Sequence, residues 1–117
     1  MQFDPMRPIW AQVMAAIETD IVTGKRRPGD KLPGGRELAA AYTINPNTAA
    51  RVYQALERAG LCEPRRGLGT FVTEDEIRID VLRREMAHRA VEQFLSQMAQ
   101  IGIDRQDAIR LLEKEES

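Results

Sequence analysis

The strongest constraint on the fold is a helix start at Asn45, where the chain reads Asn-Pro-Asn-Thr. Asn is a favoured N-cap residue, and Pro46 fits the first helical position because the N–H that it lacks would have no partner there. The pattern predicts a helix that ends at Gly60. A shorter helix is expected over residues 34–42, with a tight turn at residues 43–44. Two short helices joined in this way are typical of a helix-turn-helix.

Residues 61–73 predict a β-hairpin directly after the helix-turn-helix. Two short runs, Leu61-Cys62-Glu63 and Thr70-Phe71-Val72, are strand candidates. Between them, residues 64–69 contain two glycines and two arginines, a composition that favours a hairpin turn. A hairpin in this position forms the wing of a winged helix-turn-helix.

One further helix and a connector precede the helix-turn-helix. Valine or isoleucine recurs at every fourth position of residues 8–23, which predicts an amphipathic helix that ends before Gly24. The members of this stripe are Ile9, Val13, Ile17 and Ile21. Prolines and a glycine break up residues 25–33 and leave room for a very short strand at Lys31-Leu32. We interpret the basic run at residues 25–27 as a solvated turn.

Residues 74–117 predict two helices that carry more apolar surface than they can bury alone. The first ends at Gly102, and Asp104 caps the second. The apolar stripe of the first helix is expected to form a dimer interface. Its members are Leu82, Met86, Ala90, Val91, Phe94, Leu95, Met98 and Ile101. The pair either folds back on the preceding domain or packs against its copy in a two-fold dimer, and we favour the dimer.

The expected fold is therefore mostly α-helical with a small β-wing. A winged helix-turn-helix DNA-binding domain is expected at residues 1–73, and a two-helix dimerisation appendage at residues 74–117.

Composition argues against several classes of protein. The chain of 117 residues has one cysteine and one histidine, too few for an internal disulfide or a histidine-rich metal site. No apolar run approaches the roughly 18–20 residues that cross a bilayer, and no secretory signal is recognised, so we expect a cytoplasmic protein without membrane contact. Catalytic groupings and phosphate-binding loops are lacking, so no catalysis, cofactor or metal is expected. We interpret Cys62 as a small buried residue and His88 as a surface residue.

Charge is distributed unevenly, although the net charge is only −1. Residues 1–73 carry ten Lys or Arg against seven Asp or Glu, whereas residues 74–117 carry seven against eleven. Such an asymmetry can indicate a nucleic-acid partner. With only six aromatic residues, the chain offers little surface for stacking single-stranded bases.

Five sequence runs span residues 24–72 in a characteristic order and spacing. They are G-x-x-x-P-G-D-K-L-P from Gly24 to Pro33, Arg36-Glu37-Leu38-Ala39, Asn45-Pro46-Asn47-Thr48, Leu56-Glu57-Arg58-Ala59-Gly60-Leu61 and Gly67-x-Gly69-Thr70-Phe71-Val72. Together they resemble the winged helix-turn-helix domain of the GntR family of bacterial transcription regulators, over about residues 8–73. The Asn-Pro-Asn-Thr start and the two-helix tail look most like the YtrA subfamily, whose members lack a large effector domain. The resemblance implies a sequence-specific regulator, most simply a repressor, that binds a palindromic double-stranded DNA operator as a homodimer.

The chemistry of the helix start and of the wing agrees with DNA binding. A recognition helix places its N-terminal side chains at base edges, where the amide of Asn47 can pair with adenine. Arginine fits a narrow minor groove, and glycine allows close backbone approach. With the resemblance, this chemistry predicts DNA contacts at Lys31, Arg36, Asn45, Asn47, Thr48, Arg51, Arg65, Arg66, Gly67, Gly69 and Thr70. The alternative roles are helix capping for Asn47 and Thr48, a surface salt bridge for Arg36, and solvated surface charge for Lys31, Arg65 and Arg66.

The chain departs from the family pattern at three places in the helix-turn-helix. Many relatives carry Ser where Gly34 stands, and many relatives outside the subfamily carry Arg or Ser where Pro46 stands. Ala49 and Ala50 give the recognition helix a bare face where others carry a larger or basic side chain. The operator sequence is therefore not transferable from a relative.

Two other functions compete with DNA-binding regulation. A winged helix that serves only as a protein-interaction module predicts that Arg36, Asn47, Thr48 and Arg66 are dispensable. An aminotransferase-like domain, which follows a similar winged domain in some family members, does not fit into residues 74–117. A small-molecule effector of unidentified chemistry is a further partner to be considered, either at the dimer interface or between the tail and the winged domain.

Overall fold

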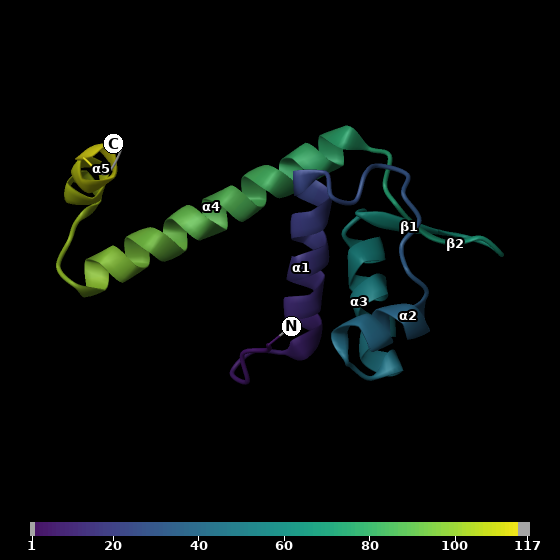
Figure 1. Ribbon diagram of the computed structural model, residues 1–117. Helices are drawn as coiled ribbons and strands as arrows, with labels where there is room; N and C mark the ends of the chain where they lie inside the picture. Colours follow the sequence, from purple (N-terminus) through teal and green to yellow (C-terminus); the bar gives the residue numbers. More distant parts are fainter. Residues whose placement is uncertain (1, 115–117) are drawn as a thin grey trace. The chain divides into compact units, whose positions relative to one another are not determined.

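The computed structural model describes residues 2–114. Along this part of the chain, the elements follow in the order α1 (Ile9–Thr23), α2 (Gly35–Tyr42), α3 (Pro46–Arg58), β1 (Cys62–Arg65), β2 (Gly69–Val72), α4 (Glu76–Gln100) and α5 (Arg105–Lys114) (Figure 1). The predicted class, mostly helical with a two-stranded wing, is confirmed. The chain divides into two compact units, a winged unit up to Leu82 and a tail unit from Arg83 onward.

The core of the winged unit lies between α1, α2 and α3. From α1, Val13, Ile17 and Ile21 are at most 2% exposed, as their four-residue spacing predicts. The buried side chains of α2 are Leu38 and Ala39, and those of α3 are Ala49, Val52, Tyr53 and Leu56. Ile9, the fourth member of the predicted stripe, is 45% exposed. It is the first residue of α1, and its side chain is only partly covered.

The helix start predicted at Asn45 is confirmed in its details. Pro46 is the first residue of α3, and the Asn45 Oδ1 accepts a hydrogen bond of 2.7 Å from the Asn47 N–H. In the turn before α3, Thr43 adopts a left-handed conformation with a φ of 54°. The Ile44 N–H then donates a hydrogen bond of 2.9 Å to the Ala39 carbonyl. These bonds fix the direction in which α3 leaves the turn.

The wing is an antiparallel pair in which Cys62 faces Val72 and Arg65 faces Gly69. The connector adds a short third segment to β2, because the Leu32 N–H donates to the Thr70 carbonyl and the Val72 N–H donates to the Asp30 carbonyl, both at 2.8 Å. The very short strand predicted at Lys31-Leu32 is thus present as a bridge between Lys31 and Phe71. The connector and the wing therefore form one backbone-bonded layer.

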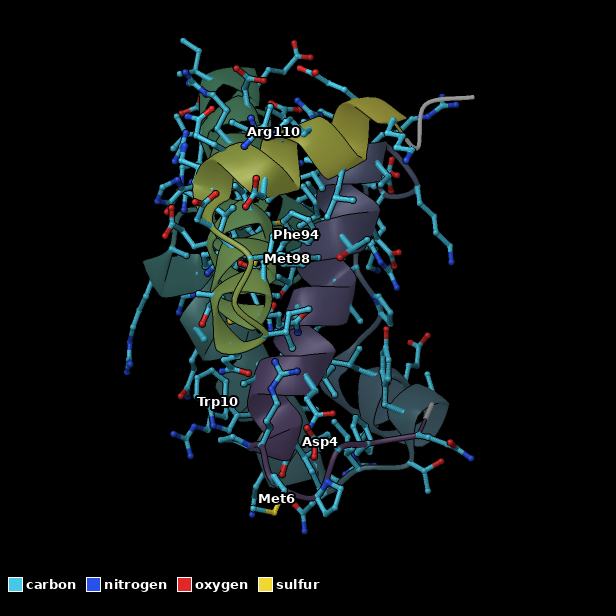
Figure 2. The ribbon with its side chains drawn as sticks, turned by 90° about the vertical axis from the view of Figure 1, so that its left-hand side faces the viewer. Asp4, Met6, Trp10, Phe94, Met98 and Arg110 are labelled. Atoms are coloured by element: carbon cyan, nitrogen blue, oxygen red, sulfur yellow. The ribbon has the colours of Figure 1, made fainter. Side chains whose placement is uncertain are left out.

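A buried glutamine fastens the segment before α1. Gln12 is 6% exposed, and its Oε1 accepts from the Asp4 N–H at 2.9 Å. Its Nε2 donates to the carbonyls of Asp4 and Arg7 at 2.8 and 3.1 Å. Figure 2 shows Asp4 and Met6 in this segment, close to the first turn of α1. The sequence pattern, which treats Gln12 as an ordinary helix residue, did not predict this clamp.

The helices of the tail begin and end near the predicted positions. The Asp104 Oδ1 accepts from the Asp107 N–H at 2.9 Å, which confirms the predicted cap, and Gly102 has a φ of 80°. The first turns of α4 belong to the winged unit, where Ile79 and Leu82 are 6% and 2% exposed. The winged unit thus extends past residue 73, and the functional division at residues 73–74 stays a prediction.

Candidate nucleic-acid interface

The outward face of α3 carries a row of polar side chains. Asn47, Arg51, Gln54 and Arg58 recur at helical spacing opposite the buried side, and all four are exposed. They line a groove of about 450 Å³ together with Trp10, Ala50 and Ala55. Among residues 2–114, no acidic side chain lines this groove. The row has the chemistry of a DNA-reading surface, because it combines two guanidinium groups with two side-chain amides.

Sequence reasoning found only part of this row. Asn47 and Arg51 were predicted to contact DNA, whereas Gln54, Arg58 and Trp10 were missed. The helical spacing Asn47, Arg51, Gln54 and Arg58 would have identified the outward face, once Val52 and Leu56 had fixed the buried side. Trp10 was missed because it lies on another helix, so no local pattern joins it to α3.

Two of the predicted residues in this region already have intramolecular partners. The guanidinium of Arg51 lies 4.6 Å from the centre of the Trp10 ring, in a cation–π contact. Asn45 uses its side-chain oxygen to cap α3, as the predicted helix start at Asn45 requires. Thr48 is half-buried, whereas Asn47 is exposed and its side chain has no hydrogen bond within the described residues.

The start of α2 lies beside a second groove, of about 440 Å³, lined by Arg26, Lys31, Leu32, Pro33, Gly34 and Glu37. Gly34 is the N-cap and supplies no side-chain hydrogen bond to the helix. The first N–H groups of α2 therefore lack a side-chain acceptor, and such groups attract anions, including phosphate. Arg36, in the first turn, is exposed, and no ion pair involves it in the described part of the chain.

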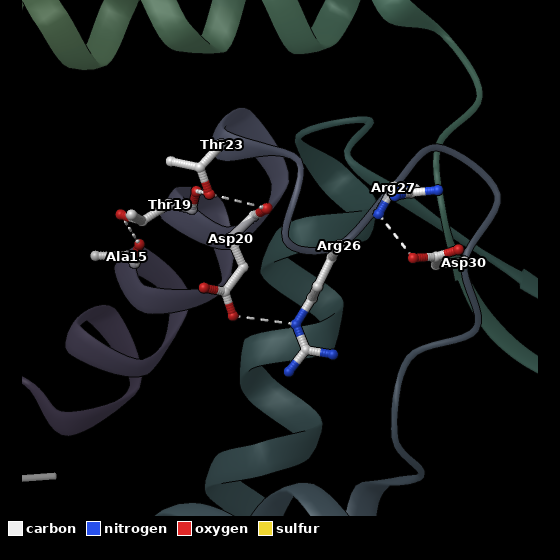
Figure 3. Close-up of polar contacts among 7 residues, drawn as sticks. All are labelled: Ala15, Thr19, Asp20, Thr23, Arg26, Arg27 and Asp30. Atoms are coloured by element: carbon white, nitrogen blue, oxygen red, sulfur yellow. Dashed lines mark hydrogen bonds and ion pairs between the residues drawn. The ribbon is translucent and has the colours of Figure 1, made fainter.

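The basic turn before this groove was predicted to be solvated, but one of its three basic side chains is paired within the fold. Figure 3 shows the Arg26 Nε donating to the Asp20 Oδ2 at 3.3 Å, and the Arg27 N–H donating to the Asp30 Oδ2 at 2.7 Å. The first contact joins the end of α1 to the connector, and both partners are largely shielded from solvent. Arg26 is therefore a structural residue, not a solvated one.

A tyrosine from α3 fixes the other side of the same groove. The Tyr53 hydroxyl donates a hydrogen bond to the Pro33 carbonyl, directly before the start of α2. Burial raises the pKa of Tyr53 to about 12, although the positive charge of Arg26 acts in the opposite direction. The hydroxyl thus remains a proton donor at neutral pH and ties the entry of α2 to α3.

The two wing arginines have different surroundings. The Arg65 guanidinium lies 4.3 Å from the centre of the Phe71 ring, and its Nη2 lies 3.2 Å from Glu63 Oε1 and 4.0 Å from Glu74 Oε1. Arg66 is exposed, and no ion pair involves it among residues 2–114. The two residues were predicted as equivalent DNA contacts, but only Arg66 presents an uncommitted charge.

The two glycines of the wing, Gly67 and Gly69, have different structural roles. Gly67 has a φ of 75°, and nothing lies within 4 Å of the position that a Cβ would occupy. Gly69 has a φ of 118°, and a Cβ there would lie 2.9 Å from the Cε of Lys31. Gly69 thus allows the Lys31 side chain to cross the wing, where Thr70 is half-buried next to it. The close approach to Gly69 therefore positions the side chain of Lys31, which was predicted to bind a phosphate.

The residues predicted for the dimer interface fall into three classes of exposure. Leu82 is buried in its own winged unit, so it has almost no surface to offer a partner. Half-buried residues are Met86, Phe94, Leu95 and Met98, and exposed residues are Ala90, Val91 and Ile101. Figure 2 labels Phe94 and Met98 on α4. Helix α5 covers part of the stripe, because Val91, Phe94 and Leu95 line a groove of about 130 Å³ with Arg105, Ala108, Ile109 and Leu112.

Other groups that often mark functional sites have structural roles or are not found. Cys62 is 5% exposed, and burial raises the pKa of its thiol to about 12, so at neutral pH it is a protonated, buried side chain. Among the described residues, no group of three or more His, Cys, Asp or Glu is arranged to hold a metal ion. No helix within residues 2–114 is long and apolar enough to span a bilayer.

Comparison with known proteins gives the same assignment over most of the chain. Residues 10–72 match the family described as "Bacterial regulatory proteins, gntR family". The chain is 37% identical to the uncharacterized HTH-type transcriptional regulator YhcF of Bacillus subtilis over 108 residues, which are 92% of this chain and 89% of YhcF. It is 42% identical to the HTH-type transcriptional repressor YtrA of B. subtilis over 77 residues, which are 64% of this chain and 59% of YtrA.

Solved structures extend the likeness to the three-dimensional fold. A GntR family transcriptional regulator from Listeria monocytogenes matches with a TM-score of 0.88 and 39% identity, covering 97% of this chain and all of that one. The DNA-binding domain of AraR, in complex with operator ORX1, matches with a TM-score of 0.58 and 31% identity, covering 62% of this chain and 93% of that one. The chain therefore belongs to the GntR family of bacterial transcription regulators, a family of DNA-binding proteins.

Proposed function

We propose that the protein is a transcriptional repressor that binds a palindromic operator as a homodimer. The observation that carries the proposal is the exposed polar row of α3, which begins at Asn47 and lines a groove that has no acidic side chain from the described part of the chain. Two relatives support the finer details, because YtrA is named a repressor and the AraR domain is bound to an operator.

The proposed contacts divide into base reading and phosphate binding. Asn47, at the first turn of α3, reads base edges with its amide, and Thr48 supports it from the same turn. Positive charge comes from Lys31, Arg36 and Arg66, which bind phosphates on either side of the bases that Asn47 reads. These contacts give affinity without sequence preference. Asn45, Arg65, Gly67, Gly69 and Thr70 shape the reading surface.

The tail supplies the proposed dimer contact. Val91, Ile101 and Leu112 are 52%, 71% and 57% exposed in the single chain, and a second copy would cover them. Leu82 is left out of this proposed interface because it is already buried. A two-fold dimer presents two recognition helices to two half-sites, so operator symmetry would follow from protein symmetry.

An effector site inside the tail of one chain has little support. The groove between α4 and α5 holds about 130 Å³, which is below the roughly 300–1,000 Å³ typical of small-molecule sites. If an effector acts, the more fitting place is the interface that two tails would form.

Selection of duplexes from a random DNA pool, followed by anisotropy titration in a salt series and sedimentation of the protein, tests the proposal. We expect a palindromic site, half-sites about one helical turn or a multiple apart, a dimer in sedimentation, and an affinity that falls steeply with salt. Failure to enrich any sequence, with only weak salt-sensitive binding, would instead favour a protein-interaction module. A promoter-reporter assay then separates repression from activation.

A further inference from the structure

We propose that the groove between the first turn of α1 and the outward face of α3 binds the DNA backbone, and that Trp10 positions Arg51 there to hold a phosphate. This inference rests on the proposed DNA-binding function. It adds a second helix to the reading surface and gives a role to a tryptophan that no motif had singled out.

The groove has the charge and the shape that a sugar–phosphate backbone requires. Its charged lining residues are Arg51 and Arg58, and its other polar groups are the amides of Asn47 and Gln54. Phosphates are bound by arginine, by side-chain amides and by hydroxyl groups in most protein–DNA interfaces. Because Arg51 lies one helical turn after Asn47, a duplex read by Asn47 would bring its backbone to this part of α3.

Trp10 restrains the side chain that carries the charge. The 4.6 Å contact places the guanidinium of Arg51 over the indole ring, and Trp10 is itself half-buried. Contact with a ring face leaves the N–H edge of a guanidinium able to bind an oxygen, while it reduces the number of side-chain conformations. A phosphate contact made by a restrained arginine loses less side-chain entropy on binding.

The first turn of α1 is anchored, so Trp10 is not on a loose end. Gln12, two residues later, is buried and makes three hydrogen bonds to the backbone of Asp4 and Arg7. These bonds fasten the segment that leads into the helix. The side chain that fixes Arg51 is thus itself fixed by the fold, as a preorganised binding site requires.

The test combines variants of the pair with two labelled duplexes, one carrying the selected site and one of unrelated sequence. For Arg51→Ala we expect the slope of log affinity against log salt to fall in magnitude by about 1, with a loss of roughly tenfold in affinity on both duplexes. Trp10→Ala should weaken binding about threefold in the wild-type background and leave the affinity of Arg51→Ala unchanged. Trp10→Phe, which keeps an aromatic face, should bind nearly as the wild type does.

Three results would overturn the inference while wild-type binding stands. They are an unchanged salt slope in Arg51→Ala, a loss confined to the selected duplex, and effects of Trp10→Ala and Arg51→Ala that simply multiply. If the wild type binds neither duplex, the proposed function fails first.

A fluorescence measurement covers the case in which Trp10→Ala does not fold. Trp10 is the single tryptophan of the chain, so its emission in the intact protein reports on this groove alone. We expect the emission to change when the selected duplex saturates the protein. Emission that stays constant at saturation would contradict the placement of DNA in the groove.

Discussion

The winged unit and the tail unit bury their apolar side chains to very different extents. In the winged unit, Val13, Leu38, Val52, Leu56 and Leu61 are each 0% exposed. In the described part of the tail unit, Ala108 is the one buried apolar residue, while Ile101 and Leu112 are more than half exposed. The winged unit therefore completes its core within one chain, whereas the tail leaves apolar side chains exposed, where a partner could cover them.

This difference separates two tasks that a dimeric regulator must perform. A domain with a complete core holds its recognition helix in one geometry, because a close-packed interior resists small shifts. A pair of helices with exposed apolar residues gains free energy by covering them, at about 25 cal/mol per Å² of apolar surface removed from water. We infer that the first unit reads DNA and that the second joins two readers.

The largest effect is expected from a charge placed in the apolar groove of the tail. Phe94→Asp should shift the protein to monomers, because an ionised carboxylate would then lie among the mostly apolar side chains of this groove, whose one charged lining residue among those described is Arg105. Loss of the linked second half-site should weaken operator binding by roughly 10²- to 10⁴-fold, with little effect on an isolated half-site. Analytical ultracentrifugation and anisotropy measure the two quantities.

Ser96→Asp is the matched control for this variant. Ser96 lies two residues away on the same helix and is exposed, so the added charge remains in water. We expect its sedimentation and operator affinity to match the wild type. If Phe94→Asp also remains a dimer with unchanged helix content, the role assigned to the tail is wrong.

The next effect concerns the reading surface of the winged unit. Arg36→Ala and Asn47→Ala should each weaken operator binding by about 1–3 kcal/mol while the dimer stays intact. Asn47→Ala should also relax the base preference at one position of each half-site, whereas Arg36→Ala should reduce binding to every sequence. Lys114→Ala, which removes an exposed charge from α5, is the control and should change neither quantity. Unchanged operator binding in both test variants would refute the site assignment.

A smaller effect, on stability, is expected at the joint between α2 and α3. Tyr53→Phe removes the donor of a hydrogen bond to the Pro33 carbonyl and should lower the free energy of unfolding by about 1–2 kcal/mol. Burial raises the pKa of Tyr53 from 10.0 to about 12, so the contribution of Tyr53 to wild-type stability should be constant below pH 10 and fall as the pH rises from 10 to 12. The tyrosine contribution to that fall should vanish in the variant. Urea unfolding at several pH values tests both points, and an identical pH profile in the variant would exclude this role.

The order of the helices and the wing could be predicted from the sequence because their signals are local. The cap at Asn45, the glycine after α1 and the four-residue apolar spacing each act within a few residues of chain, and each is confirmed. The contacts of Arg51 with Trp10 and of Gln12 with Asp4 join residues that no periodic pattern links. Because local sequence does not show such contacts, Arg65 and Arg66 were predicted to have the same role, since neighbouring arginines in a turn have nearly the same local sequence.

The smallest predicted effect separates these two arginines. Arg66→Ala should lower the salt slope of DNA binding by about 1 and leave thermal stability unchanged, because no ion pair involves Arg66 among the described residues. Arg65→Ala should instead cost about 0.5–1 kcal/mol of stability, since it removes a cation–π contact with Phe71 and a partly exposed ion pair with Glu63. Its salt slope should change less than that of Arg66→Ala. If both variants lower the slope equally and neither lowers the melting temperature, Arg65 also contacts DNA directly, and its intramolecular contacts are released on binding.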